Sequence, residues 1–130
     1  MADLLILAHG GTWDMRFQTS SLAASAAAGG DRVDLALFFG ALEAWSAGRW
    51  DELDPQPPLS AERLEALDMP PLSQMLAPGR EDGLIRIYAC SATAHLLGLD
   101  LARVQASVDA LLGWQSFSRM IRETPRVVTL

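Results

Sequence analysis

The only thiol in this chain of 130 residues belongs to Cys90. It lies in the stretch IRIYACSATAH, residues 85–95, where a run of strand-forming residues stops and small residues begin. A chain with one cysteine forms no internal disulfide, so any thiol chemistry needs a partner sulfur from outside the chain. Cys90 is therefore the first candidate for a reactive group.

The residues after Cys90 predict a helix that begins next to the sulfur. Ser91 and Thr93 are of types that cap helices, and a helix over 92–97 ends naturally at Gly98. Unpaired N–H groups around Ser91 and Ala92, together with the positive end of the helix dipole, would favour a thiolate, which is the nucleophilic form. The alternative is an inert thiol in the core, because free cysteine is among the most buried residue types.

Two histidines are the other candidates for chemistry beside the thiol. His9 follows the first apolar run, and a sheet that pairs its first strand with its third would bring His9 to Cys90 and activate the thiol. A histidine that only borders the glycine turn is the alternative. His95 lies five residues beyond Cys90, and we expect it to point away from the thiol as a partly exposed helix residue.

The elements that must position these residues begin with a β-α-β unit. The apolar run DLLILA, ended by HGGT, is typical of a strand buried on both faces. The Ala-rich stretch from residue 13 to the paired glycines 29–30 predicts a helix with a glycine C-cap, and VDLALFF, residues 33–39, predicts a second strand. A β-α-β unit builds a parallel sheet.

The middle of the chain predicts a connection and two short helices. GRWDELDPQPPL, residues 48–59, is rich in proline and acids and indicates an irregular surface connection. Ser60 caps a predicted helix that Pro70 and Pro71 end. A further helical piece over 72–79 is expected to stop at Pro78 and Gly79.

The last part of the chain again alternates between strand and helix patterns. GLIRIYAC predicts the third strand, VDALLGW a short fourth, QSFSRMIRE a last helix and RVVTL a closing strand. We therefore expect one α/β domain over residues 1–130. Its mostly parallel sheet of about five strands carries helices on both faces, in the doubly wound, Rossmann-like manner.

Composition excludes several classes of function. The net charge of -6, without any basic run, argues against a surface for nucleic acid or anionic membranes. All ten basic residues are arginine, which rules out Schiff-base chemistry and a Walker-type lysine. No apolar run approaches the length of a secretory or membrane-spanning segment. These features favour a cytoplasmic protein without membrane contact.

The sequence predicts no cofactor and no metal. HGGTWD has the glycines of an anion-binding turn but lacks the third glycine of a dinucleotide-binding loop. A tight turn with Thr12 or Asp14 as the helix cap explains this stretch better. Two histidines and one cysteine without a recognised ligand spacing argue against a zinc site.

The acidic, tryptophan-bearing segment 40–58 fits none of these patterns. Trp45 and Trp50 lie where a core position is hard to arrange, so the sequence leaves two interpretations open. Either they anchor a subunit or partner, or they pack the loop onto the domain.

Residues 69–120 resemble the DsrE/DsrF-like family of small sulfur-relay proteins. The resemblance rests on MPPLSQMLAPGREDGLIRIYACSATAHLLGL followed by VDALLGWQSF: a Pro-containing helical stretch, a Gly, an apolar strand, an A-C-S turn with a short helix and a Gly-Leu, and a later Gly-aromatic segment. The family's cysteine falls on Cys90. The acidic segment 40–58 does not align with any motif of the family.

The resemblance implies that Cys90 accepts sulfane sulfur as a persulfide and passes it to a small sulfur-carrier protein. It also implies a homo-oligomer, a trimer or a hexamer. Because some members are labelled predicted peroxiredoxins, thiol peroxidation at Cys90 is one alternative. An oligomeric ligand-binding or scaffold module, in which Cys90 only packs, is the non-enzymatic alternative.

Overall fold

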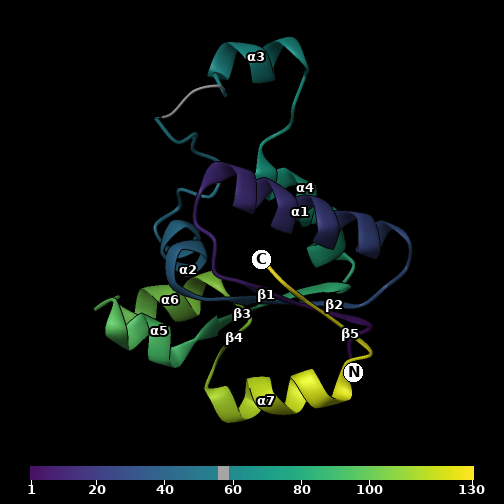
Figure 1. Ribbon diagram of the computed structural model, residues 1–130, viewed down its shortest axis with the longest axis vertical. Coiled ribbons are helices and arrows are strands. Elements are labelled where there is room, and N and C mark those ends of the chain that lie inside the picture. The colour runs from purple at the N-terminus through teal and green to yellow at the C-terminus, as the bar shows by residue number, and fades with distance from the viewer. Residues whose placement is uncertain (56–58) are drawn as a thin grey trace.

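The computed structural model describes residues 1–55 and 59–130. Five strands and seven helices are described in this part of the chain (Figure 1). The strands are β1 (Leu4–Ala8), β2 (Val33–Leu37), β3 (Ile85–Cys90), β4 (Ala110–Leu112) and β5 (Arg126–Thr129). The helices are α1 (Trp13–Ala28), α2 (Phe39–Ser46), α3 (Ala61–Ala66), α4 (Leu72–Glu81), α5 (Ser91–Leu96), α6 (Leu101–Ser107) and α7 (Trp114–Glu123).

All five strands form one parallel sheet in the order β4-β3-β2-β1-β5. The single α/β fold with a parallel five-stranded sheet and helices on both faces confirms the expected architecture. The predicted strands are all present, and each lies within the residues that its sequence pattern indicated.

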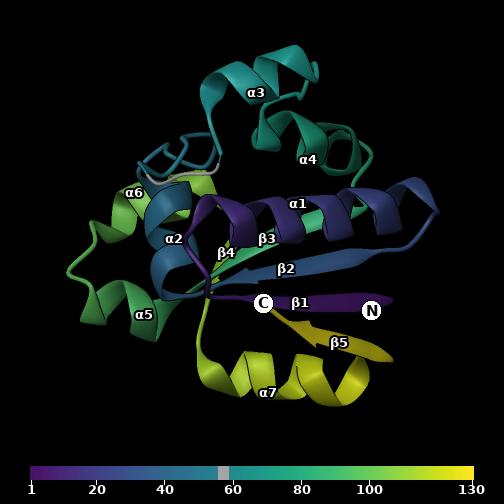
Figure 2. The same cartoon turned by 45° about the horizontal axis from the view of Figure 1, so that its top comes forward.

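The direction of the crossovers explains which helices cover which face. The connections β1–β2, β2–β3 and β3–β4 each lead to the neighbouring strand on the same side. Only the connection from β4 to β5 runs back across the sheet, to the far side of β1. Since β-α-β crossovers are right-handed, the return puts its helix on the opposite face. Figure 2 shows α1 and α4 on one side of the sheet and α7 on the other.

Two apolar clusters occupy the two faces of the sheet. The larger joins β1, β2 and β3 to α1, α2 and α4, with Leu35, Leu42 and Leu76 fully buried in it. The smaller lies under α7 and includes Leu5, Ala36, Phe38, Cys90 and Phe117. Cys90 therefore belongs to the face that α7 covers.

Three features of the helices differ from the sequence-based expectations. α2 and α6 were not predicted, and α4 continues through Pro78 to Glu81. Gly79 explains the continuation of α4, because a Cβ there would lie 2.5 Å from the side chain of Ile85 and 3.1 Å from Ala27. This close packing of α4 on α1 and β3 outweighs the backbone hydrogen bond lost at proline.

α3 stands apart from the sheet layers. Ser60 caps it as predicted, since its hydroxyl accepts a hydrogen bond from the N–H of Arg63 at 3.2 Å. None of the residues of α3 is buried, and Figures 1 and 2 show the helix projecting beyond α1 and α4.

Candidate functional site

Cys90 is the last residue of β3 and the N-cap of α5. Its backbone is extended, with φ -79° and ψ 118°, and its Sγ accepts a hydrogen bond from the N–H of Thr93 at 3.5 Å. The prediction that Ser91 and Thr93 would cap this helix was wrong. The helix begins one residue earlier than expected, at Ser91, so the sulfur itself takes the place of a capping oxygen.

The sulfur is enclosed by apolar side chains. Cys90 has no exposed surface, and its cluster contains Leu5, Ala36, Phe38 and Phe117. The pleat of β3 explains this position, because Arg86, Tyr88 and Cys90 alternate onto one face while Ile85, Ile87 and Ala89 turn to the larger core. The thiol is therefore both a helix cap and a core residue.

Aromatic rings at the start of α7 close the space next to Cys90. The ring centroids of Phe38 and Phe117 are 5.1 Å apart, and Trp114 lies 5.2 Å from Phe38 and 5.8 Å from Phe117. Phe117 is fully buried, whereas Trp114 is 53% exposed. The rings thus run from the buried thiol cluster to solvent.

Ser91 and Ala92 form the outer surface above the thiol. Ser91 is half-buried and Ala92 is exposed. A Cβ on Gly113, the N-cap of α7, would lie 3.8 Å from the Ser91 hydroxyl, so the starts of α5 and α7 are neighbours. The contact between the starts of α5 and α7 therefore lies next to Cys90 in the chain, since Ser91 directly follows the cysteine.

His9 does not lie beside Cys90. The expectation that the first strand pairs with the third was wrong, because β2 lies between β1 and β3. Two strand spacings separate the two strand ends by roughly 10 Å. His9 is exposed, and its N–H donates to the Leu130 carbonyl at 3.1 Å, which fits the interpretation of a histidine bordering the glycine turn. His95 is exposed on α5, as expected.

Between β1 and β5 the connecting helices change from one face of the sheet to the other, and open α/β sheets usually bind ligands at such a point. Here the main chain of Leu130 occupies that edge. Its carbonyl accepts from the N–H groups of His9 and Gly10, both at 3.1 Å, and its own N–H donates to the Leu7 carbonyl. The thiol thus lies at the carboxyl end of the sheet, two strands away from this point.

The turn HGGTWD serves packing. Thr12 is the N-cap of α1, but its hydroxyl donates to Asp14 and makes no cap bond to the helix. That bond, with a second one from the N–H of Met15, lowers the pKa of the Asp14 carboxyl below its ordinary value. Gly11 meets Gly40 backbone to backbone, since a Cβ on Gly11 would lie 2.7 Å from Gly40. This contact explains why the turn is rich in glycine.

The acidic segment 40–58 is packed onto the domain over its described part, and residues 56–58 lie outside the described residues. Trp50 is buried and its ring N–H donates to the Ser20 hydroxyl at 2.9 Å. Trp45 lies in α2 and donates to the Ser107 carbonyl at 2.8 Å. The structure thus favours loop packing for both tryptophans. The described part of the predicted irregular connection, residues 48–55 and 59, contains neither helix nor strand, as expected, whereas the helix α2 that carries Trp45 was not predicted.

Arg16 holds this segment in place. The guanidinium is almost fully buried and donates to the carbonyls of Gly11 and Arg49 at 3.0 Å each, and to that of Trp50. It also contacts the Asp54 carboxylate at 3.2 Å. Sequence reasoning missed Arg16, although its place on the stripe Trp13, Arg16, Ser20, Ala23 and Ala27 of α1 marked it as inward-facing.

A second group of polar residues on the Cys90 face was also missed. Asp34 and Arg86 are register partners on β2 and β3, and Tyr88 follows on the same face of β3. Burial raises the pKa of Asp34, and the charge of Arg86 partly offsets this effect. Burial and the Asp34 charge likewise raise the pKa of Tyr88, while Arg86 lowers it. The sequence did contain a sign of this group, because Asp34 and Arg86 are charged residues within strands whose other residues are mostly apolar.

Within the described residues, no group of three or more His, Cys, Asp and Glu side chains is arranged to hold a metal ion. In the same part of the chain, no helix has the length and apolar character needed to cross a membrane. A scan against protein-family models gives no match, and neither does a comparison with curated proteins.

Proposed function

We propose that this protein relays sulfane sulfur through Cys90, which takes up one sulfur atom as a persulfide and passes it to an acceptor thiol. The observation that carries the proposal is the hydrogen bond from the N–H of Thr93 to Sγ of Cys90. A donor directed at the sulfur stabilises the negative charge of a thiolate or a persulfide. The resemblance of residues 69–120 to DsrE/DsrF-like proteins supports the same role.

The reaction is a transfer of sulfur without net oxidation. The Cys90 thiolate attacks the outer sulfur of a donor persulfide or polysulfide, a new S–S bond forms, and the donor leaves as the shortened thiolate. In the second step an acceptor thiolate attacks the outer sulfur on Cys90, and the S–S bond to Cys90 breaks. Cys90 returns to its thiolate, so the chain needs no second cysteine.

The relay requires the thiol to become accessible. Because Cys90 has no exposed surface, a donor reaches it only after residues around it move, and we infer that the start of α7 moves away from α5. Gly113 and Trp114 form the outer part of this contact, and Trp114 is already half exposed. Local opening of one short helix costs less free energy than global unfolding.

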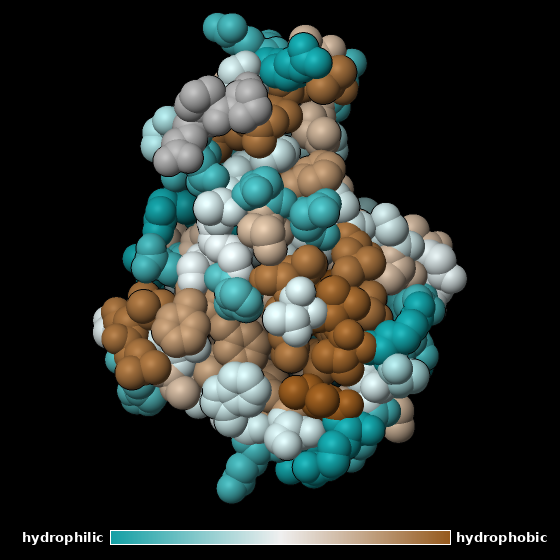
Figure 3. Space-filling view, viewed as in Figure 1, coloured by the Kyte–Doolittle hydropathy of each residue, from teal (hydrophilic) through white to brown (hydrophobic). Residues whose placement is uncertain are grey.

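The proposal includes a cytoplasmic homo-oligomer, a trimer or a hexamer, and a small sulfur-carrier protein as acceptor. Large apolar side chains near the carboxyl ends of β2, β3 and β4 support a protein contact there. Leu96 is 74% exposed and Phe39 is 48% exposed. Figure 3 shows apolar surface over α5, where Leu96 lies. Phe39 also has a φ of 39°, a strained conformation for a non-glycine residue.

Intact-protein mass spectrometry after brief treatment with inorganic polysulfide tests the uptake step. Wild type should gain one sulfur, about 32 Da, and lose it on reduction. Cys90→Ala should gain nothing. Reduction is essential, because two added oxygens have nearly the same mass but a sulfinic acid survives the reductant. A parallel hydrogen peroxide arm tests thiol peroxidation, which predicts rapid oxygen addition in place of sulfur.

Complete burial of Cys90 favours a second candidate, the non-enzymatic ligand-binding or scaffold module. In that case the sulfur serves as helix cap and core residue only. This alternative predicts that neither polysulfide nor peroxide modifies the folded protein. It also predicts that Cys90→Ser leaves the cellular function unchanged, which would contradict the relay.

A further inference from the structure

Helix α7 covers only part of its face of the sheet. α7 has ten residues, and its buried side chain Phe117 reaches the carboxyl half of this face, next to Phe38 and Cys90. Toward the amino ends of β2 and β3 the face opens into a hollow of about 380 Å³. A volume of roughly 300 Å³ or more is enough for a small-molecule ligand.

Four charged side chains line this hollow, two of each sign, and the backbone ammonium group of Met1 lies at its edge as well. The four side chains are Arg32, Asp34, Asp82 and Arg86. None of the four forms an ion pair with another of the residues that the structure describes. Asp34 and Arg86 are register partners on adjacent strands, yet their charged groups stay more than ion-pair distance apart. Opposite charges therefore surround one space without direct contact between them, although the charges of Arg86 and of the Met1 ammonium group partly offset the effect of burial on the pKa of Asp34.

Asp34 is the most informative of these groups. Its carboxyl is half-buried on the floor of the hollow, and burial raises its pKa because water no longer surrounds it fully. Arg86 and Arg32 are exposed around it. A half-buried carboxylate without a contacting cation is stabilised when a ligand supplies one.

We propose that this hollow binds a small zwitterion, whose carboxylate contacts the guanidinium groups of Arg32 and Arg86 and whose ammonium group contacts Asp34 and Asp82. A simple anion would meet two carboxylates, and a simple cation would meet two guanidinium groups. A molecule with both charges satisfies all four side chains. Tyr88, which also lines the hollow, offers a hydroxyl as a further hydrogen-bonding group.

The site is separate from the thiol. Arg86 and Cys90 lie four residues apart on β3, which corresponds to roughly 13 Å along a strand. Tyr88 stands between them on the same face. The zwitterion site therefore does not depend on the proposed sulfur relay, and Cys90→Ala should bind the same ligands with unchanged affinity.

Titrations followed by ¹H–¹⁵N NMR test the proposal with matched probes. The zwitterions are glycine, 4-aminobutyrate and 6-aminohexanoate, which differ in charge separation. Butyrate and butylammonium carry one charge each. We expect saturable shifts at the backbone N–H groups of Asp34, Gly83 and Arg86. At least one zwitterion should bind about tenfold more tightly than either singly charged probe. No saturable shift, or equal affinity for all five probes, would overturn the proposal.

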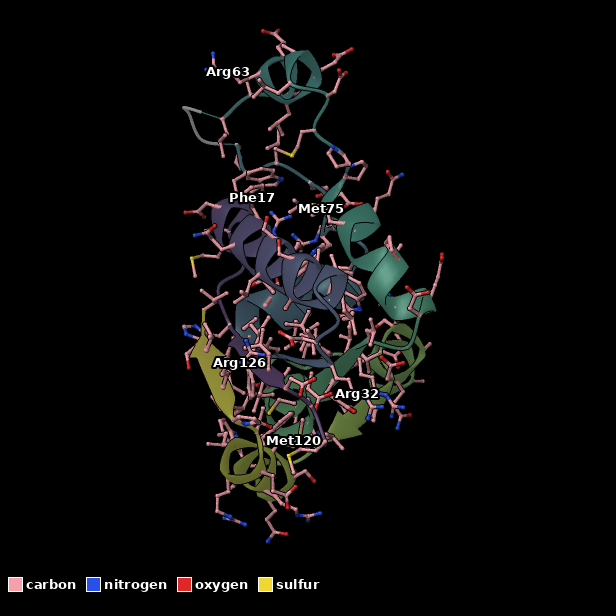
Figure 4. The ribbon with its side chains drawn as sticks, turned by 90° about the vertical axis from the view of Figure 1, so that its right-hand side faces the viewer. Phe17, Arg32, Arg63, Met75, Met120 and Arg126 are labelled. Carbon is pink, nitrogen blue, oxygen red and sulfur yellow. The ribbon has the colours of Figure 1, made fainter. Side chains whose placement is uncertain are left out.

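Two variants test which side chain binds the carboxylate and which binds the ammonium group of the ligand. Arg86→Gln should weaken binding of the best zwitterion and of butyrate by about tenfold and leave butylammonium unaffected. Asp34→Asn should weaken binding of the best zwitterion and of butylammonium by about tenfold and leave butyrate unaffected. Arg63→Gln is the matched control, because Arg63 lies on α3 at the top of the molecule in Figure 4, whereas Arg32 lies in its lower half. Urea unfolding checks that each variant is folded, and folded variants that bind like wild type would contradict the site.

Discussion

Arg16 shows how much of this structure one charged side chain can determine. A guanidinium has donors in several directions, and here they reach two loop carbonyls of the acidic segment, the Gly11 carbonyl and Asp54. The N–H of Trp13 also donates to Asp54, at 2.6 Å. The first turn of α1 thus fixes the loop that carries Trp50.

Arg16→Ala should lower the free energy of unfolding by about 3 kcal/mol, because it leaves loop carbonyls and Asp54 without their partner. Arg16→Lys should recover only part of this loss, since an ammonium group cannot donate in the same fork. Urea unfolding monitored by tryptophan fluorescence measures both. Arg122→Ala, on the exposed side of α7, should change the value by less than about 0.5 kcal/mol. A loss below about 1 kcal/mol for Arg16→Ala would contradict this role.

At the level of residues, the sequence predicted the position of Cys90 at a strand end before a short helix. It did not predict that Sγ would accept the N–H of Thr93, because the start of α5 shifted by one residue. The charges of Asp34 and Arg86 were visible in the sequence. Their placement opposite each other on neighbouring strands was not visible, since it depends on the register between β2 and β3.

Among the elements, α7 has the largest influence on the candidate thiol. It supplies Phe117, the largest fully buried side chain, and Met120 to the cluster that contains Cys90. The rest of α7 is largely exposed and polar. Such a helix is held mainly by its one apolar stripe, so a change at Phe117 should alter access to the thiol.

Phe117→Ala should increase the rate at which a thiol reagent labels Cys90 by about tenfold or more, because a truncated ring weakens the closed position of α7. Phe117→Leu should give a smaller increase while keeping the fold. Phe17→Ala makes the same chemical change on α1, where the ring stacks on Trp13 at 5.4 Å, and should leave the rate unchanged. Equal labelling rates in wild type and both Phe117 variants would show that α7 does not control access.

Strand and cap patterns predicted most elements, and the misses have physical causes. α2 begins at Phe39, whose positive φ is a conformation that this residue type does not favour. α4 passes Pro78 because Gly79 packs closely on Ile85. The continuation of α4 depends on a contact between distant segments, and the start of α2 depends on an unfavourable backbone conformation; local propensity contains neither.

On the scale of the whole molecule, the alternation of strands and helices predicted a parallel sheet but not its order. In the order β4-β3-β2-β1-β5, the connection from β4 to β5 runs opposite to the others, and its helix α7 therefore lies on the face opposite α1 and α4. The buried thiol and the open hollow both follow from that arrangement. The expected pairing of His9 with Cys90 failed for the same reason.

The proposed homo-oligomer predicts that wild type sediments as a trimer or a hexamer. Leu96→Asp should shift the distribution toward the monomer, because it puts a charge into an apolar contact. Leu67→Asp is the matched control, since Leu67 is 63% exposed at the end of α3, away from the sheet edge. Sedimentation velocity distinguishes these outcomes, and a wild-type monomer at a concentration of about 100 μM would contradict the proposal.

The most direct test of the relay is to follow one labelled sulfur through Cys90. The protein is loaded from ³⁴S-labelled polysulfide, freed of donor and mixed with glutathione as acceptor thiol, and both products are read by mass spectrometry. If Cys90 relays sulfur, about one labelled sulfur per chain should leave Cys90 and appear as glutathione persulfide. Label that stays on the protein, or equal transfer by Cys90→Ala, would contradict the relay.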